Sequence, residues 1–196
     1  SRHGEIKYIL PVMEKACRII KDRLGDNVRF LLPLAPTINE NDIMANLKNK
    51  DNIDLFEIVD SKGGSSSYDV YSVSDHVLLA SGTATVEAGL FERPMSIVYK
   101  VSKLSAFLFK HLIRYKNPIG MVNLLLKEPV VNEFFQNKAD PQKIAEDVMA
   151  TLFDEKINLS RKKSLQELKR VLYTGESPSL KLAKNLIKHL QIGEKC

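Results

Sequence analysis

The segment from residue 81 to 95, SGTATVEAGLFERPM, combines residue types that could bind a phosphorylated nucleotide. Gly82 would let a ligand approach the backbone closely, and Thr83 is a candidate N-cap for the helix predicted to follow. Free N–H groups at the start of that helix would attract a phosphate. Because like charges repel, we expect Glu87 to accept hydrogen bonds from ribose hydroxyls instead. The residues alone also allow an ordinary strand-to-helix turn, with Glu87 favoured by the helix dipole.

The elements around this segment alternate between strand and helix. We predict helices over 5–24, from Asn39 to about residue 50 and over 68–75, and strands over 28–34, 53–60, 76–80 and 95–100. This alternation predicts an α/β fold with a parallel sheet and helices on both faces, in which ligands bind beyond the carboxyl ends of the strands. After residue 100 we predict mostly helix, with starts where Asp140 precedes Pro141 and Ser177 precedes Pro178.

The composition fits one globular domain and excludes several classes of protein. The chain has 196 residues, 44% of them hydrophobic, which allows a substantial core. Two cysteines, Cys17 and Cys196, predict neither a disulfide framework nor a zinc site. Residues 156–196 hold ten Lys or Arg against three acids, which indicates either a solvated helical face or an anionic partner. Aromatic residues are not interleaved with these basic residues, so we expect no nucleic acid partner.

Other motifs that carry chemistry are missing from the sequence. It has no G-x-G-x-x-G after a strand, no P-loop and no H-E-x-x-H, so we expect neither a classical dinucleotide site nor a metal site. Asp75 and His76 precede Ser81 without the G-x-S-x-G motif of a hydrolase. Residues 99–116 mix basic and apolar side chains at helical spacing, which is typical of a helix on an anionic bilayer or of one that packs on the core.

Three blocks of the chain carry a resemblance to a known family. They are SRHGEIKYILPVMEKA (1–16), SDHVLLASGTATVEAGLFERPMSIVYK (74–100) and GMVNLLLKEPVVNEFFQNKADPQKIAEDV (120–148). In this order they resemble the C-terminal half of the lipid-A-disaccharide synthases, and the resemblance covers essentially the whole chain. It implies a glycosyltransferase of the GT-B type, in which two Rossmann-like domains enclose the active site. Residues 1–196 would form the C-terminal, UDP-sugar-binding domain, with a helical C-terminal extension.

The resemblance also implies a reaction and a place in the cell. The family joins UDP-2,3-diacylglucosamine to 2,3-diacylglucosamine 1-phosphate and releases UDP, without a metal or other cofactor. The partners would be this donor, the lipid acceptor and a membrane surface, and the enzyme would lie peripherally on the cytoplasmic face of the bacterial inner membrane. The alternatives are another GT-B enzyme, such as a UDP-N-acetylglucosamine epimerase, or a non-catalytic nucleotide-sugar-binding domain.

Seven positions match residues that bind the UDP moiety in the family. The matched arginine and the glycine-containing turn would face the diphosphate, the acid would bind the ribose, and the asparagine would line the donor site. These positions are Arg2, Ser81, Gly82, Thr83, Thr85, Glu87 and Asn123. The sequence departs from the family at His3, where a small residue is usual, and at Val122, where a proline usually precedes the asparagine.

The ends of the chain lead to two further expectations. The chain opens at Ser1 inside the first matching motif, so we expect the N-terminal acceptor domain, with the general base, to lie outside it. No catalytic residue is therefore expected within these residues. Residues 177–196 are predicted to form a helix that packs on the N-terminal domain or on a partner chain, and exchange of this helix would give a homodimer.

Overall fold

The structure is a computed structural model that describes residues 3–60, 66–102, 118–173, 175 and 177–193. Arg2 and most of the amphipathic segment 99–116 lie outside these ranges. The described residues form a parallel α/β fold of the Rossmann-like type, as the alternation of elements predicts. None of the described helices combines the length and the apolar character that crossing a bilayer requires.

Five strands of the described residues form two parallel sheets. In the first, β1 (Phe30–Pro33) pairs with β2 (Phe56–Val59). The second has the order β3 (Val77–Ala80), β4 (Met95–Tyr99), β5 (Asn132–Phe135), with Val77 opposite Met95 and Ser96 opposite Asn132. Because all strands of the second sheet run parallel, their carboxyl ends share one edge, and the loops that follow them meet there.

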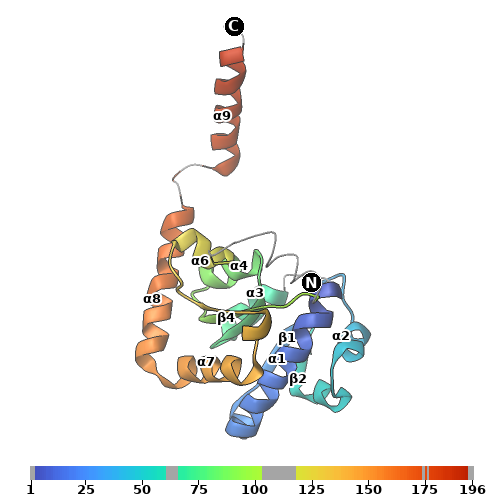
Figure 1. Cartoon of the computed structure of the whole chain (residues 1–196). Helices are drawn as coiled ribbons and strands as arrows, with labels where there is room; N and C mark the ends of the chain where they lie inside the picture. Colours follow the sequence, from blue (N-terminus) through green and yellow to red (C-terminus); the bar gives the residue numbers. More distant parts are fainter. Residues whose placement is uncertain (1–2, 61–65, 103–117, 174, 176, 194–196) are drawn as a thin grey trace.

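Helices connect the strands and cover both faces of the second sheet (Figure 1). The helices are α1 (His3–Leu24), α2 (Glu40–Asn46), α3 (Ser66–Val73), α4 (Ala84–Leu90), α6 (Met121–Leu126), α7 (Pro141–Phe153), α8 (Glu155–Leu172) and α9 (Pro178–Gly193). Three short 3-10 helices of the described residues occupy Gly25–Asn27, Lys50–Leu55 and Gln136–Lys138.

The side chains of β4 show how the two faces are filled. Successive residues of a strand point to opposite faces of the sheet. Met95 and Ile97 pack against α3, α4, α6 and α8, whereas Val98 packs against α1 and α7. All three side chains are buried, so this strand lies at the centre of the core. The prediction of helices on both faces is therefore confirmed.

The predicted helix starts are confirmed, and one strand was missed. The Asp140 side chain accepts the Lys143 N–H and Pro141 is the first residue of α7, while α9 begins at Pro178. The prediction of a mostly helical region after residue 100 misses β5, whose first residue is an exposed asparagine and whose second is a glutamate. Asparagine and glutamate are uncommon in strands, so the two phenylalanines that follow them are too short a run to predict a strand.

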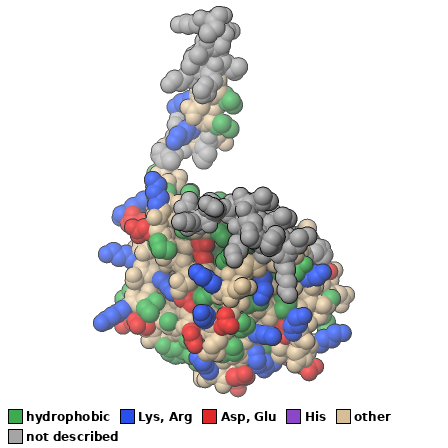
Figure 2. Space-filling model, viewed as in Figure 1, with side chains coloured by type: hydrophobic (Ala, Val, Ile, Leu, Met, Phe, Trp, Pro, Cys, Tyr) green, Lys and Arg blue, Asp and Glu red, His purple; other side chains and the backbone are tan. Residues whose placement is uncertain are grey.

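The C-terminal helix α9 extends away from the rest of the molecule (Figure 1). Its described part carries basic as well as apolar side chains (Figure 2). Four of its apolar side chains are 50 to 60% exposed, namely Leu180, Leu182, Leu186 and Ile187. An amphipathic helix gains little stability unless its apolar face is covered, so this face is suited to another surface.

Candidate functional site

The β3–α4 turn, residues 81–83, leads from the carboxyl end of β3 directly into α4. Gly82 has φ +154°, a conformation that residues with a side chain rarely adopt. A Cβ atom built on Gly82 would meet nothing within 4 Å, so the turn requires glycine for its backbone conformation and not for space. The Gly82 carbonyl accepts the Thr85 N–H at 3.1 Å, and the Thr83 carbonyl accepts the Val86 N–H at 2.9 Å.

The two threonines of this segment have different environments. Thr83 is at the N-cap position of α4 and exposed, and its side chain makes no capping hydrogen bond. Thr85 is completely buried, and its Oγ1 donates to the Gly82 carbonyl at 2.8 Å. Thr85 therefore supports the turn from the protein side, while Thr83 is the threonine available to a ligand.

The turn offers backbone donors to an anion. Within the described ranges, the amide N–H groups of Gly82, Thr83 and Ala84 have no hydrogen-bond partner. Consecutive free amides at the start of a helix suit phosphate oxygens. Among all residues that the structure describes, no three His, Cys, Asp or Glu side chains are grouped closely enough to hold a metal ion.

Glu87 lies one turn further along α4 and is half-buried. Its charge acts on Tyr71 of α3, which is buried. Burial, followed by the charge of the Glu87 carboxylate and by Tyr68, raises the pKa of Tyr71 to about 12. Glu87 and the neutral phenol of Tyr71 are therefore close enough to interact electrostatically. The structure brings this acid and the β3–α4 turn together at one end of α4.

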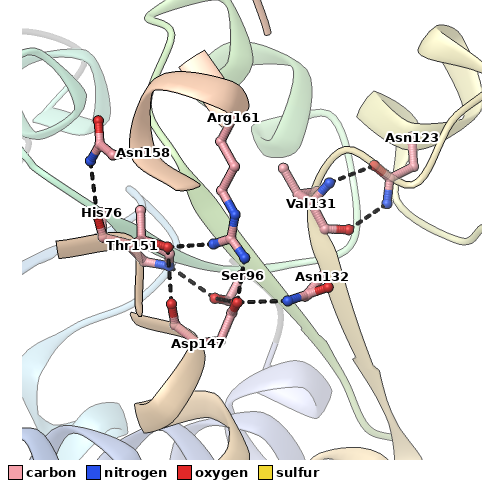
Figure 3. Close-up of polar contacts among 9 residues, drawn as sticks. All are labelled: His76, Ser96, Asn123, Val131, Asn132, Asp147, Thr151, Asn158 and Arg161. Carbon is pink, nitrogen blue, oxygen red and sulfur yellow. Dashed lines mark hydrogen bonds and ion pairs between the residues drawn. The ribbon is translucent and has the colours of Figure 1, made fainter. Parts of the chain in front are cut away.

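Asn123 is buried in α6 and makes three contacts within the protein. Its Nδ2 donates to the Val131 carbonyl at 2.9 Å and to Glu133 Oε1 at 2.7 Å, and its Oδ1 accepts the Val131 N–H at 3.1 Å. Figure 3 shows the paired contact with Val131. These bonds join α6 to the start of β5. A direct contact of Asn123 with a sugar donor stays a prediction.

Sequence reasoning missed Glu133 of β5. Its carboxylate accepts the N–H of Ile119 at 2.7 Å and the N–H of Gly120 at 3.0 Å, in addition to the Asn123 side chain. The carbonyl of Ile119 in turn accepts the Ser81 hydroxyl at 3.0 Å. The only sequence signal for this role is a lone acid within the run VVNEFF (130–135), in the middle of the third block.

A second polar cluster joins the second sheet to α7 and α8 (Figure 3). The His76 Nε2 lies 2.9 Å from the Ser96 hydroxyl, which donates to the Asp147 carboxylate. Asp147 also accepts the Asn132 amide at 2.6 Å and forms an ion pair with Arg161. Ser96 is fully buried and Asp147 is 8% exposed.

This cluster contains serine, histidine and aspartate but is not arranged as a catalytic triad. In a triad the serine donates to the histidine, whereas Ser96 donates to Asp147 and accepts from His76. Burial lowers the pKa of His76 from 6.5 to about 4, Asp147 opposes this shift and Arg161 adds to it. His76 is therefore neutral at pH 7, and its role is to pack and orient the cluster.

The lowered pKa of His76 predicts a loss of stability in mild acid. The unfolded chain takes up a proton near pH 6.5 and the folded chain only near pH 4, so stability is full above pH 6.5 and falls as the pH drops toward 4. Between pH 7.5 and 5.5 this one group should cost about 1 kcal/mol. Urea unfolding at both pH values should show that loss in the wild type and a smaller one in His76→Gln. An equal loss in both chains would contradict the assignment.

Comparison with known proteins places this arrangement in a family. The family model described as Lipid-A-disaccharide synthetase matches residues 1–187. The Lipid-A-disaccharide synthase of Syntrophus aciditrophicus is 35% identical over 167 residues, which cover 85% of this chain and 41% of the relative. That of Persephonella marina is 30% identical over 192 residues, 98% of this chain and 49% of the relative. That of Nitrosococcus oceani is 35% identical over 176 residues, 89% of this chain and 43% of the relative.

The match to the family model includes the whole second sheet and the β3–α4 turn. The chain spans about half the length, or somewhat less, of the curated relatives that it matches. The resemblance carried by the three sequence blocks is thus confirmed by a match that covers nearly all of the chain. The chain belongs to the lipid-A-disaccharide synthase family.

Proposed function

We propose that this chain is the UDP-sugar-binding part of a glycosyltransferase that makes the lipid A disaccharide. The reaction joins UDP-2,3-diacylglucosamine to 2,3-diacylglucosamine 1-phosphate and releases UDP. Family membership supports the class of enzyme and disfavours a UDP-N-acetylglucosamine epimerase. The observation that carries the site is the β3–α4 turn, where Gly82 holds an unusual conformation beside free backbone amides.

In this proposal the turn stabilises charge on the departing UDP. Transfer of the sugar passes through an oxocarbenium-like state, as in glycoside hydrolysis, and negative charge grows on the diphosphate as the bond breaks. The amides of Gly82 and Thr83, together with Arg2, would hold that diphosphate. Donors aimed at developing charge lower the barrier, and losing one such donor costs on the order of 2–4 kcal/mol in the transition state. Glu87 would accept the ribose hydroxyls, one helical turn away.

The acceptor side of the reaction belongs to other parts of the protein in this proposal. The general base that activates the acceptor hydroxyl would come from an N-terminal domain outside these residues. The exposed apolar face of α9 would pack on that domain, or on a partner chain in a homodimer formed by exchange of these helices. The lipid substrates would bring the enzyme to the cytoplasmic face of the bacterial inner membrane.

Calorimetric titration with UDP tests the site. We expect the wild-type chain to bind UDP weakly and Glu87→Gln to bind it roughly tenfold or more weakly, since hydrogen bonds to a charged group are stronger than those to a neutral amide. Glu92→Gln is the matched control, because Glu92 follows the same helix and contacts Lys169 and Gln166 of α8 instead.

Each outcome bears on a separate claim. Equal UDP affinity in the wild type and Glu87→Gln would refute the ribose assignment. A wild-type chain that binds no UDP would refute the proposed donor-binding role. Weakening of equal size in Glu92→Gln would show that the effect comes from disturbing α4 and not from a missing contact.

A further inference from the structure

We propose that Glu133 is a positioning residue that sets the conformation of the β3–α4 turn from two strands away. It lies in β5, while the turn follows β3, and β4 separates the two strands. Glu133 accepts the N–H groups of Ile119 and Gly120, and the peptide unit between these two residues accepts Ser81. The proposal rests on the proposed function, because the turn matters for the reaction only if it binds UDP.

The peptide unit that joins Ile119 to Gly120 is held from opposite sides. Its N–H, which belongs to Gly120, donates to Glu133 Oε1 at 3.0 Å. Its C=O, which belongs to Ile119, accepts the Ser81 hydroxyl at 3.0 Å. A trans peptide is planar, with its N–H and C=O pointing in opposite directions, and no described peptide is cis. Glu133 and Ser81 therefore act on one rigid group, and bonds in such a chain polarise one another.

The carboxylate is firmly fixed before it acts on this unit. It also accepts the Ile119 N–H at 2.7 Å and the Asn123 side chain at 2.7 Å. Three hydrogen bonds to one ionised acceptor are charge-assisted and so stronger than neutral ones. The Asn123 amide is in turn held by the backbone of Val131, which is buried. The chain from Val131 to Ser81 thus contains no freely rotating side chain.

Gly120 also packs too closely on the sheet to carry a side chain. A Cβ atom on Gly120 would lie 2.3 Å from Ile97 Cδ1 and 3.0 Å from Glu133 Oε1. Gly120 is buried, and Ile97 is a core residue of β4. Gly120 therefore packs against the Ile97 side chain of β4 with no room for a side chain of its own, which helps to fix where the Ile119 carbonyl meets Ser81. Because Gly82 directly follows Ser81, the contact between Ser81 and Ile119 also limits how the β3–α4 turn can tilt.

The chain supplies a matched control in Glu14 of α1. Its carboxylate accepts two consecutive backbone N–H groups, those of Lys48 at 2.7 Å and Asn49 at 3.0 Å, and the Asn52 side chain at 2.7 Å. Glu133 likewise accepts two consecutive backbone N–H groups and one asparagine side chain. Glu14, however, supports the segment that leads to β2, in the other sheet. Changing either glutamate to glutamine removes the same kind of bonds in a different place.

The experiment compares Glu133→Gln and Glu14→Gln in the whole chain. In glutamine an NH2 group replaces one carboxylate oxygen, so a donor faces a backbone N–H donor in both variants. Both should therefore lose stability in urea to a similar extent. Only Glu133→Gln should shift the backbone amide resonances of Gly82 and Thr83 in 15N-labelled protein. Only Glu133→Gln should raise the Kd for UDP, by roughly tenfold, the effect of displacing about one charge-assisted bond.

A second variant, Ser81→Ala, removes the hydroxyl that donates to the Ile119 carbonyl. Ser81 is half-buried, so we expect the fold to tolerate this change. It should shift the Gly120 amide resonance, and in its background Glu133→Gln should weaken UDP binding less than it does in the wild type. Equal weakening in both backgrounds would overturn the proposal. So would unchanged Gly82 and Thr83 resonances in Glu133→Gln, or equal shifts of these resonances in Glu14→Gln.

The test also separates this proposal from the proposed function. If UDP binding is weakened by Glu87→Gln but not by Glu133→Gln, the positioning role is overturned and the donor site stands. If the wild-type chain binds no UDP, the donor site is overturned, while the Gly82 and Thr83 resonances of Glu133→Gln still show whether Glu133 sets the conformation of the turn.

Discussion

Replacing Gly82 by valine should reduce UDP binding by roughly a hundredfold or more while the chain remains folded. At φ +154° a β-branched side chain costs on the order of 1–3 kcal/mol, which the turn can relieve only by changing its backbone conformation. That change would turn the amides of Gly82 and Thr83 away from the diphosphate. Two hydrogen bonds to a charged group contribute about 1.5–3 kcal/mol each, which sets the size of the loss. Calorimetric titration with UDP measures it.

Gly25 provides the control for this variant. It also has a positive φ, +57°, and a Cβ atom there would also meet nothing within 4 Å. Gly25→Val should therefore strain the backbone in a similar way, at the end of α1 and away from the turn. We expect it to lower stability without changing the Kd for UDP. Wild-type affinity in Gly82→Val would contradict the role given to the turn.

Asp147→Leu should destabilise the fold by about 3–5 kcal/mol. The substitution removes the carboxylate that accepts Ser96, Asn132 and Arg161, and it leaves the Arg161 guanidinium, whose side chain is only 13% exposed, without its counter-ion. Breaking a buried ion pair from one side costs this much because a charge stays desolvated and uncompensated. Since domains of this kind are stable by only about 5–15 kcal/mol, the urea midpoint should fall strongly.

Two further variants identify the cause of this loss. Adding Arg161→Met to Asp147→Leu removes the unpaired charge and should recover part of the lost stability. Glu57→Gln, in an exposed pair with Arg29, should leave the urea midpoint unchanged, because solvent screens such pairs. A small effect of Asp147→Leu, or a double variant less stable than the single one, would contradict the explanation.

Much of this fold follows from local sequence signals. The cap at Asp140, the proline at the start of α9 and the alternation of apolar residues depend on neighbours within a few positions. The same is true of the β3–α4 turn, where glycine, hydroxyl residues and an acid are adjacent. Such features are encoded by backbone preferences and helix capping, which act over one or two turns.

The contacts that hold the site in place were not predictable in this way. Glu133 reaches Gly120 across 13 positions, and Ser81 reaches Ile119 across 38. The cluster at Asp147 joins residues 51 positions apart. These contacts depend on the register of β3, β4 and β5, and β5 itself was missed because its polar first half does not read as a strand. Asn123 illustrates the same limit, since its internal partners are set by where β5 lies.

The measurement that tests the central claim most directly is a titration of the 15N-labelled chain with UDP, followed residue by residue. If the chain is the donor-binding part of the enzyme, UDP will shift and saturate the amide resonances of Gly82, Thr83, Ala84 and Glu87, with a common Kd. Shifts confined to other parts of the chain, or no saturable shifts at all, would contradict it.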